Sequence, residues 1–272
     1  MTVTISDIIT CLDAIAPFGM AQSWDNVGLL IGDRRREVKS ILVGLDPTNR
    51  LLKEALDKGA DTVITHHPAI FKPFPSIDTA EPSGSFLETA LVSRLNILAC
   101  HTNFDSAVGG VNDALAELLG LAELSALVPA EANGTEGAGL GRLGRYPEAR
   151  SGREFIELLL DILELSSVQV AGVIPERIES VALCGGSGSE FAETARQRGA
   201  DLYISAEIKH NIGCWAEEAG FCVIDGTHYA TEKPAVKLLT EHLVSYAQTQ
   251  GWDLTIFEST SEKHPFSTVT RQ

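Results

Sequence analysis

Two adjacent histidines follow a short β-branched run, at the point where that run ends. The run is Thr62-Val63-Ile64-Thr65, and His66, His67 and a proline come directly after it. Imidazole is the commonest metal-binding side chain near neutral pH. Two polar rings at the end of a buried strand are also costly to desolvate without a partner. The pair therefore predicts a ligand-binding site at this strand end.

The same residue types recur at two other predicted strand ends. His101 and Asp105 follow residues 96–100, and His228 and Glu232 follow residues 221–225. Ligands of α/β folds gather at the carboxyl ends of the strands. Imidazole and carboxylate without a thiolate suit Zn, Fe, Mn, Co or Ni in an open site better than a structural zinc knuckle. We therefore predict bound divalent ions.

The spacing of these residues adds detail to that prediction. Successive residues of an extended chain point to opposite sides, so His66 and His67 are expected to serve different ions. If a helix begins near Tyr229, His228 and Glu232 share one of its faces. A carboxylate such as Glu232 could bridge two ions about 3.5–4 Å apart, as in two-metal hydrolytic sites. Together with Asp105, these residues supply about six bonds and leave positions for water or substrate.

Other polar residues have two interpretations. His101 could ligate an ion, act as a base or orient Asp105. His242 and His264 have no partners nearby in the pattern and are expected to be hydrogen-bonded structural residues. Residues 184–190, "CGGSGSE", are a tight turn or a phosphate cradle at a helix start. They fit neither a Walker loop nor the G-x-G-x-x-G pattern.

Alternating helices and strands must position these residues. Helical periodicity and end signals predict helices at residues 5–17, 48–59, 85–95, 110–120, 153–165, 189–199 and 232–250. Short apolar runs predict strands at residues 40–46, 61–65, 96–100, 180–185, 201–205, 221–225 and 254–260. Residues 127–152 are rich in Gly, Ala and Pro without a clear period and are predicted to be a crossover between two halves.

The two halves resemble each other. Residues 58–68 align with residues 198–208 at an offset of 140, and residues 42–46 align with 182–186 at the same offset. Either the fold is duplicated, or any two βαβ units look alike. The predicted domains are residues 1–126 and residues 127–272, the second including the Gly-rich crossover. Glu207, Lys209 and His210 follow the strand that matches the His66 strand, so they line the same cleft or form an exposed turn.

Composition excludes several classes of protein. The 272 residues carry a net charge of −16, which argues against a nucleic-acid partner. No apolar span of about 20 residues predicts a membrane helix, and the N-terminus does not resemble a secretory signal. Five cysteines without a CxxC pair predict buried, reduced thiols in a cytoplasmic protein. Arg34-Arg35-Arg36 is expected to be a solvated turn.

Several motifs in order carry a family resemblance. They are "SWDNVGLLIG", "ITHHP", "HTNFD", "GRLG", "GADLYISAEIKH" and "IDGTHYATEKP". Together they resemble the NIF-three-like family of dinuclear metal proteins, whose members are called GTP cyclohydrolase type-two homologues. The resemblance covers nearly the whole chain. It implies two linked α/β halves, two divalent ions in the cleft between them, a ring-shaped homohexamer, and a short form without an inserted domain.

The resemblance also implies a ligand set. The family's metal ligands fall on His66, His67, Asp105, His228 and Glu232, the set that the residue types predict. "SAEIKHNI" departs from the usual form, which has a glycine before the Glu and paired histidines after the Lys. Two functions remain open. One is a metal-dependent hydrolase of a small molecule, with a nucleotide, as in a GTP cyclohydrolase, as one candidate substrate. The other is a non-catalytic metal-binding regulatory or interaction protein.

Overall fold

The computed structural model describes residues 2–130 and 136–271, and these form two compact units. Unit 1 contains Met1–Phe104 and Val236–Lys263, and unit 2 contains Asp105–Ala235 and His264–Gln272. The predicted boundary lay between residues 126 and 127, whereas the chain passes from unit 1 to unit 2 between Phe104 and Asp105. The chain enters unit 2 earlier, and a later segment returns to unit 1 because its strand pairs with the first sheet.

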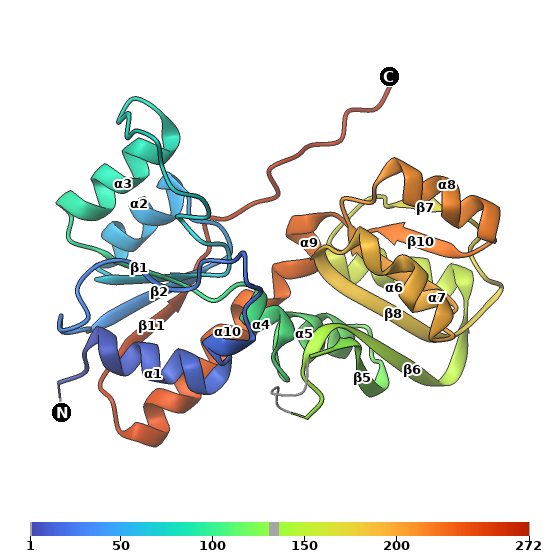
Figure 1. Ribbon diagram of the computed structural model, residues 1–272, viewed down its shortest axis with the longest axis horizontal. Helices are drawn as coiled ribbons and strands as arrows, with labels where there is room; N and C mark the ends of the chain where they lie inside the picture. The colour runs from blue at the N-terminus through green and yellow to red at the C-terminus, as the bar shows by residue number, and fades with distance from the viewer. Residues whose placement is uncertain (1, 131–135, 272) are drawn as a thin grey trace. The chain divides into compact units, whose positions relative to one another are not determined.

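Unit 1 is built on a five-stranded sheet in the order β1-β4-β3-β2-β11. Its strands are β1 (Gly28–Ile31), β2 (Ser40–Gly44), β3 (Thr62–Thr65), β4 (Asn96–Ala99) and β11 (Thr255–Glu258). Its helices are α1 (Ile5–Ile15), the short η1 (Phe18–Met20), α2 (Asn49–Lys58), α3 (Pro82–Val92) and, from Val236 on, α10 (Pro234–Gln250). Figure 1 shows α2 and α3 on one face of this sheet and α1 and α10 on the other.

Local sequence explains the central elements of unit 1. Strands β2 and β3 are buried along their whole length, as expected for continuous apolar runs in a parallel sheet. Between them, α2 begins at Thr48, whose hydroxyl accepts a hydrogen bond from the Leu51 amide at 3.1 Å. The helix ends at Gly59 in the left-handed conformation. These signals fix where β3 starts and hence where His66 lies.

Unit 2 is built on a six-stranded sheet in the order β5-β6-β8-β9-β10-β7. Its strands are β5 (Ala122–Pro129), β6 (Gly139–Ser151), β7 (Gln169–Ala171), β8 (Arg177–Ser187), β9 (Leu202–Ala206) and β10 (Cys222–Asp225). Its helices are α5 (Val111–Leu118), α6 (Gly152–Leu163), η2 (Ser189–Phe191), α7 (Ala192–Gln197), α8 (His210–Ala219) and α9 (His228–Glu232). Helix α4 (Thr102–Ser106) contains the boundary between the units.

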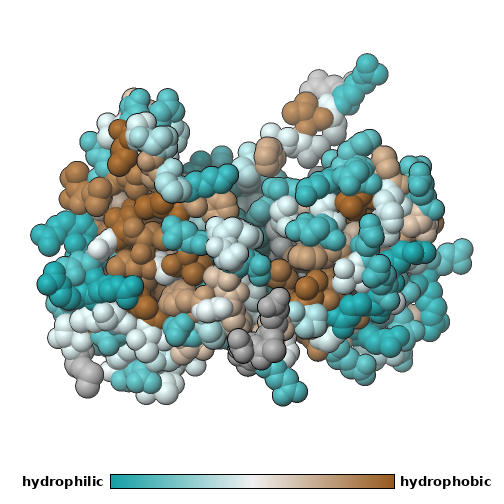
Figure 2. Space-filling view, in the orientation of Figure 1, coloured by the Kyte–Doolittle hydropathy of each residue, from teal (hydrophilic) through white to brown (hydrophobic). Residues whose placement is uncertain are grey.

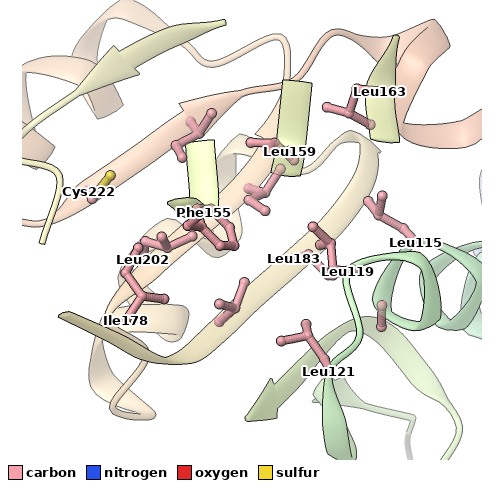
Figure 3. Close-up of a cluster of buried hydrophobic side chains, with 14 of the residues drawn as sticks. Leu115, Leu119, Leu121, Phe155, Leu159, Leu163, Ile178, Leu183, Leu202 and Cys222 are labelled. Carbon is pink, nitrogen blue, oxygen red and sulfur yellow. The ribbon is translucent and has the colours of Figure 1, made fainter. Parts of the chain in front are cut away.

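Alternate side chains of the second sheet build two apolar layers. Leu202 and Ile204 pack with residues of α5 and α6, including Leu115 and Phe155, in the cluster that Figure 3 shows. Tyr203, on the opposite face, packs with residues of α7 and α8. The sheet is therefore covered on both faces, as is typical of parallel α/β folds.

The predicted duplication is visible in strand register. Ile41 pairs with Thr62 between β2 and β3, and Val181 pairs with Leu202 between β8 and β9, each 140 residues later. Each unit has an antiparallel edge strand, β1 or β7, beside its third parallel strand. A side-chain contact repeats too. Asp61 accepts hydrogen bonds from the amides of residues 39 and 40, and Asp201 accepts them from the amides of residues 179 and 180. Two unrelated βαβ units would not share register and side-chain bonding, so we interpret the units as copies.

The predicted crossover at residues 127–152 is wrong over most of its length. Strand β5 ends at Pro129, and residues 139–151 form β6, which pairs with both β5 and β8. Residues 131–135 lie outside the described residues. The glycines that hid the strand allow close packing, because a Cβ on Gly144 would overlap Leu124 of β5.

Apolar residues also reach the surface. Figure 2 shows them gathered on the visible face of unit 1, and the exposed large apolar side chains of that unit include Trp24, Phe71, Leu91 and Val92. Among the described residues, no helix has the length and apolar character that a membrane crossing requires.

Candidate metal centre

Three histidines of unit 1 converge at the ends of β3 and β4. Each of His66, His67 and His101 offers one ring nitrogen within 4.8 Å of the others. The ring centroids are 4.9 Å apart for His66 and His67 and 5.2 Å apart for His66 and His101. The two adjacent rings do not point to opposite sides, because β3 ends at Thr65 and the chain is no longer extended there. His101 is thus part of the cluster.

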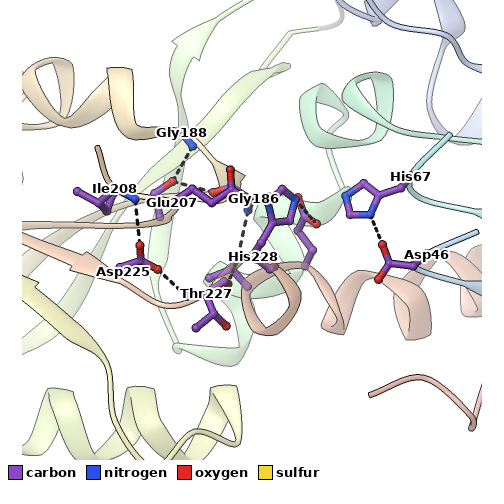
Figure 4. A network of polar contacts seen from close by, with 12 residues as sticks. Asp46, His67, Gly186, Gly188, Glu207, Ile208, Asp225, Thr227 and His228 are labelled. Atoms are coloured by element: carbon purple, nitrogen blue, oxygen red, sulfur yellow. Dashed lines mark hydrogen bonds and ion pairs between the residues drawn. The ribbon is translucent and has the colours of Figure 1, made fainter. Parts of the chain in front are cut away.

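Each of these rings is fixed through its Nδ1 atom. His66 Nδ1 lies 2.9 Å from the carbonyl oxygen of Cys100, which can only accept, so this nitrogen carries the proton. His67 Nδ1 lies 2.8 Å from an Asp46 carboxylate oxygen, as Figure 4 shows, and His101 Nδ1 lies 2.8 Å from Asp25. An oxygen partner on Nδ1 leaves Nε2 as the atom with a lone pair for a ligand.

Asp25 is held as an anion beneath His101. Burial alone would raise the pKa of Asp25, but hydrogen bonds from His101 and Thr102 outweigh it and hold that pKa below its usual range. The Thr102 amide donates to the same carboxylate at 3.0 Å. Trp24 and Phe71 pack edge-on against the His101 ring, at centroid distances of 6.3 Å and 6.2 Å. The His101–Asp25 pair is therefore rigid on both sides.

Unit 2 brings together a histidine and two carboxylates. Helix α9 begins at His228, ahead of the helix predicted from residue 232, so His228 and Glu232 are one turn apart and His228 Nε2 lies 3.1 Å from Glu232 Oε2. Asp105 offers an oxygen within 4.8 Å of Glu232. Both carboxylates are buried, with Glu232 only 3% exposed. Two like charges buried this closely are costly unless a cation lies with them.

His228 follows the same pattern as the histidines of unit 1. Its Nδ1 lies 3.0 Å from Glu207 Oε1 (Figure 4). All four of these histidines therefore direct Nδ1 at an oxygen and keep Nε2 for another contact. Metal-binding histidines usually have this second partner, which fixes the tautomer and the ring direction. The donor set, imidazole and carboxylate without thiolate, fits a divalent transition ion.

The Gly-rich residues 184–190 make room for Glu232. Gly186 has a φ of +65°, and a Cβ there would overlap Glu232 Oε1 and lie 3.2 Å from His228 Nε2. The backbone amides of Gly185, Gly186 and Gly188 already donate to side-chain oxygens of Asn112, Thr231 and Ser205. A phosphate cradle would need these amides, so the segment is structural, as the tight-turn interpretation implied.

Sequence reasoning missed the carboxylates behind the histidines. Asp46 lies two residues after the end of β2, and Asp25 lies in the "SWDN" motif, but neither was assigned a role. The signal that could have identified Asp46 was its place at the end of the predicted strand that precedes the His66 strand. Glu207, expected either to line a cleft or to form an exposed turn, has a side chain that is 62% exposed and contacts His228.

The remaining predicted residues lie elsewhere. Lys209 and His210 line a separate cavity of about 540 Å³, where His210 Nε2 lies 3.6 Å from Cys214 Sγ. His264 is hydrogen-bonded, as expected of a structural residue, but its partner is Thr227, next to His228.

Comparison with known proteins finds relatives that match this chain over nearly its whole length. A Clostridium perfringens protein named GTP cyclohydrolase 1 type 2 homolog is 31% identical over 265 residues, covering 97% of this chain and 99% of that one. A Bacillus subtilis protein of the same name is 25% identical over 363 residues, so that relative is longer and this 272-residue chain is a short form.

Solved structures extend the similarity to the fold. The crystal structure of a hypothetical protein of Staphylococcus aureus has a TM-score of 0.92 and 30% identity, covering 99% of this chain and 100% of that one. A Bacillus cereus protein related to NIF3 has a TM-score of 0.93 at 24% identity, which supports the fold alone. The profile of Duf34/NIF3 (NGG1p interacting factor 3) matches residues 3–265. The predicted resemblance and fold class are confirmed, and this chain belongs to the Duf34/NIF3 family.

Proposed function

We propose that this protein is a metal-dependent hydrolase of a small molecule, with two divalent ions held by His66, His67, Asp105, His228 and Glu232. The supporting observation is the common bonding of the histidines, whose Nδ1 atoms all contact oxygens. Metal-binding histidines usually have such an oxygen partner on the ring nitrogen that does not bind the ion. This ligand set is the one that the family resemblance implies.

The side chains have distinct roles in this proposal. His66 and His67 each supply one neutral nitrogen, and Asp105 supplies a carboxylate oxygen. Glu232, with its two carboxylate oxygens, would hold both ions. A bound divalent ion would polarise a substrate bond and lower the pKa of a bound water toward neutrality. His101, fixed by Asp25, is placed among the unit 1 donors and is proposed as the proton acceptor.

The substrate class follows from the relatives' names. Proteins similar to this one are named GTP cyclohydrolase 1 type 2 homologs, so a purine nucleotide is our first candidate, and hydrolysis at a ring carbon is the candidate reaction. The alignment with the Clostridium perfringens protein covers 97% of this chain and 99% of that one, so the proposal concerns this chain along its whole length. We further propose a homohexameric assembly, which the family resemblance implies.

Two measurements test the proposal. Elemental analysis of protein purified without chelator should approach two ions per chain, and a ratio that stays at or below one after reconstitution contradicts the dinuclear centre. Metal-loaded protein should then convert at least one nucleotide in a chromatographic screen, and chelator should abolish the conversion. Protein with two ions and no turnover across the screen would instead support a non-catalytic metal-binding role.

A further inference from the structure

A small cavity in unit 2 adjoins His228. Its volume is about 190 Å³, and its lining includes the aromatic residues Tyr229, His264 and Phe266 together with Glu207 and Thr227. The three rings stand edge to face, with centroids 5.6 Å apart for Tyr229 and His264 and 6.1 Å apart for His264 and Phe266. A cavity of this size suits one ring system rather than a whole drug-sized ligand.

The tail of the chain completes the cavity. His264 Nε2 lies 3.0 Å from Thr227 Oγ1, and His264 Nδ1 lies 2.9 Å from the Phe266 carbonyl oxygen. The described residues after His264 lie in no helix or strand. Phe266 as a residue is 82% exposed although it lines the cavity. An exposed aromatic ring held in place by a hydrogen-bonded histidine favours a stacking surface.

Backbone strain concentrates at the same place. Among the described residues, five other than glycine have positive φ, and two of them line this cavity, Glu207 at 53° and Thr227 at 62°. Positive φ is rare for a β-branched residue such as threonine. Strain of this kind persists where surrounding contacts impose it, and it clusters at ligand sites.

Asp225 holds both strained residues in position. One of its carboxylate oxygens accepts a hydrogen bond from the amide of Ile208, the residue after Glu207, at 2.9 Å. The other accepts a hydrogen bond from the Thr227 amide at 2.9 Å. Figure 4 shows these contacts at the end of β10. The Asp225 side chain therefore stabilises both unfavourable backbone conformations. As a result, Glu207 is held beside the cavity.

We propose that this cavity is a subsite for a planar heteroaromatic ring that carries N–H donors on one edge. The ring packs against Tyr229, His264 and Phe266, because every such ring has a stacking face. The Glu207 side chain is 62% exposed and uses Oε1 for His228, and its second oxygen accepts from the donor edge, as carboxylates accept from base amines. This subsite rests on the proposed hydrolase function and deepens it, because it places the ring of the substrate next to His228, a proposed metal ligand.

Guanosine is the probe, measured by equilibrium dialysis against the full chain with metal removed by chelator and again after reconstitution. Guanosine should bind in both states. Inosine lacks the exocyclic amine and should bind up to about tenfold more weakly, the effect of one hydrogen bond. Glu207→Gln should reduce that discrimination. A chain ending at Lys263 lacks the rings of His264 and Phe266 and should lose about tenfold or more in guanosine affinity.

The matched control is a chain ending at Ser267, which keeps both tail rings and should bind guanosine as the full chain does. Equal affinity in the two truncated chains, or no guanosine binding by the full chain, overturns the subsite. Metal content measured on the same samples separates the two proposals. Two ions and turnover without guanosine binding overturn the subsite alone. Guanosine binding lost on truncation supports the subsite even in a protein that hydrolyses nothing.

Discussion

Glu232 Oε2 lies 3.1 Å from His228 Nε2, and both side chains project from the same turn of α9. Glu232 is nearly buried, and the glycine at position 186 leaves the space that its carboxylate occupies. The four-residue spacing and the start of α9 at His228 place the Glu232 carboxylate beside the His228 ring. The glycine 46 residues earlier in the chain leaves the space for that carboxylate. Its two oxygens make it the one member of the pair that could contact two ions at once.

Glu232→Gln should release both ions together. The substitution keeps the size but removes the negative charge that offsets the repulsion between two dications. His67→Ala should instead keep about one ion per chain, because an imidazole nitrogen binds a single ion. Metal titration by calorimetry distinguishes the variants. Glu157→Gln is the control, since Glu157 lies on the exposed face of α6 and pairs with Arg153. Near-parental binding of two ions by Glu232→Gln would show that Glu232 does not bridge.

Gly186→Ala should weaken metal binding about tenfold or more while the protein stays folded. The added methyl group would displace the Glu232 carboxylate. Because Gly186 has a positive φ, the substitution also strains the backbone by about 1–2 kcal/mol. Gly199→Ala separates the two effects, since Gly199 has a φ of +82° but no atom within 4 Å of an added Cβ. The prediction fails if the two variants bind metal equally.

One thiol of the five should react under native conditions. Cys214 is exposed, whereas Cys11, Cys100, Cys184 and Cys222 are buried. Burial raises the pKa of Cys11, Cys100 and Cys222 to about 12, so they carry almost no thiolate at neutral pH. Titration with an aromatic disulfide reagent should show one fast thiol, and the rest should react only in denaturant. The fast phase should vanish in Cys214→Ser, and two fast thiols would contradict the burial pattern.

Acid should destabilise the protein partly through Glu54. Burial alone would raise its pKa, but hydrogen bonds from residues 259–261 lower it to about 2. Ionised Glu54 therefore stabilises the fold above the unfolded-state pKa of about 4.3, and this contribution is lost as pH falls toward 2. Glu54→Gln should lower the thermal midpoint at pH 6 by about 2–4 °C for each kcal/mol lost. The difference from the parent should shrink at pH 2.5, and a constant difference would exclude this role.

The protein should form a closed oligomer in solution. The motivation is membership of the family, for which the resemblance implies a hexamer. Exposed apolar side chains such as Val92, at 78% exposure, are available for an interface on unit 1. Light scattering after size-exclusion chromatography should give a mass near six chains at micromolar concentration. A monomer at that concentration would refute the prediction.

Sequence patterns predicted the elements whose signals are local. Helix α2 has a Thr cap and a Gly stop, and β2 and β3 are apolar throughout, so the end of β3 and the position of His66 followed directly. Repetition at an offset of 140 predicted the second unit, and strand register agrees with it. Residue type then indicated a metal site, because imidazole and carboxylate stood at several strand ends.

What sequence patterns missed depends on contacts distant in the chain. Strand β6 was hidden because its glycines, which let neighbouring strands approach, look like loop residues. Asp25 contacts a histidine 76 residues away, and no local period reveals such a partner. His264 had no partner in the sequence because its contact with Thr227 spans 37 residues. Side chains that orient other side chains are found only when the fold brings them together.

The pairing of β11 with β2 has a consequence for synthesis on the ribosome. Strand β2 lies beside β3 on one edge and β11 on the other, yet β11 begins at Thr255, more than 200 residues after β2 ends at Gly44. The amino-terminal sheet therefore leaves the exit tunnel with an open edge, which β11 can cover only after the strands of the second copy have been made. Open edges invite pairing with other chains, and late closure slows folding. Nascent chains arrested before residue 255 should therefore depend on chaperones more than released chains do.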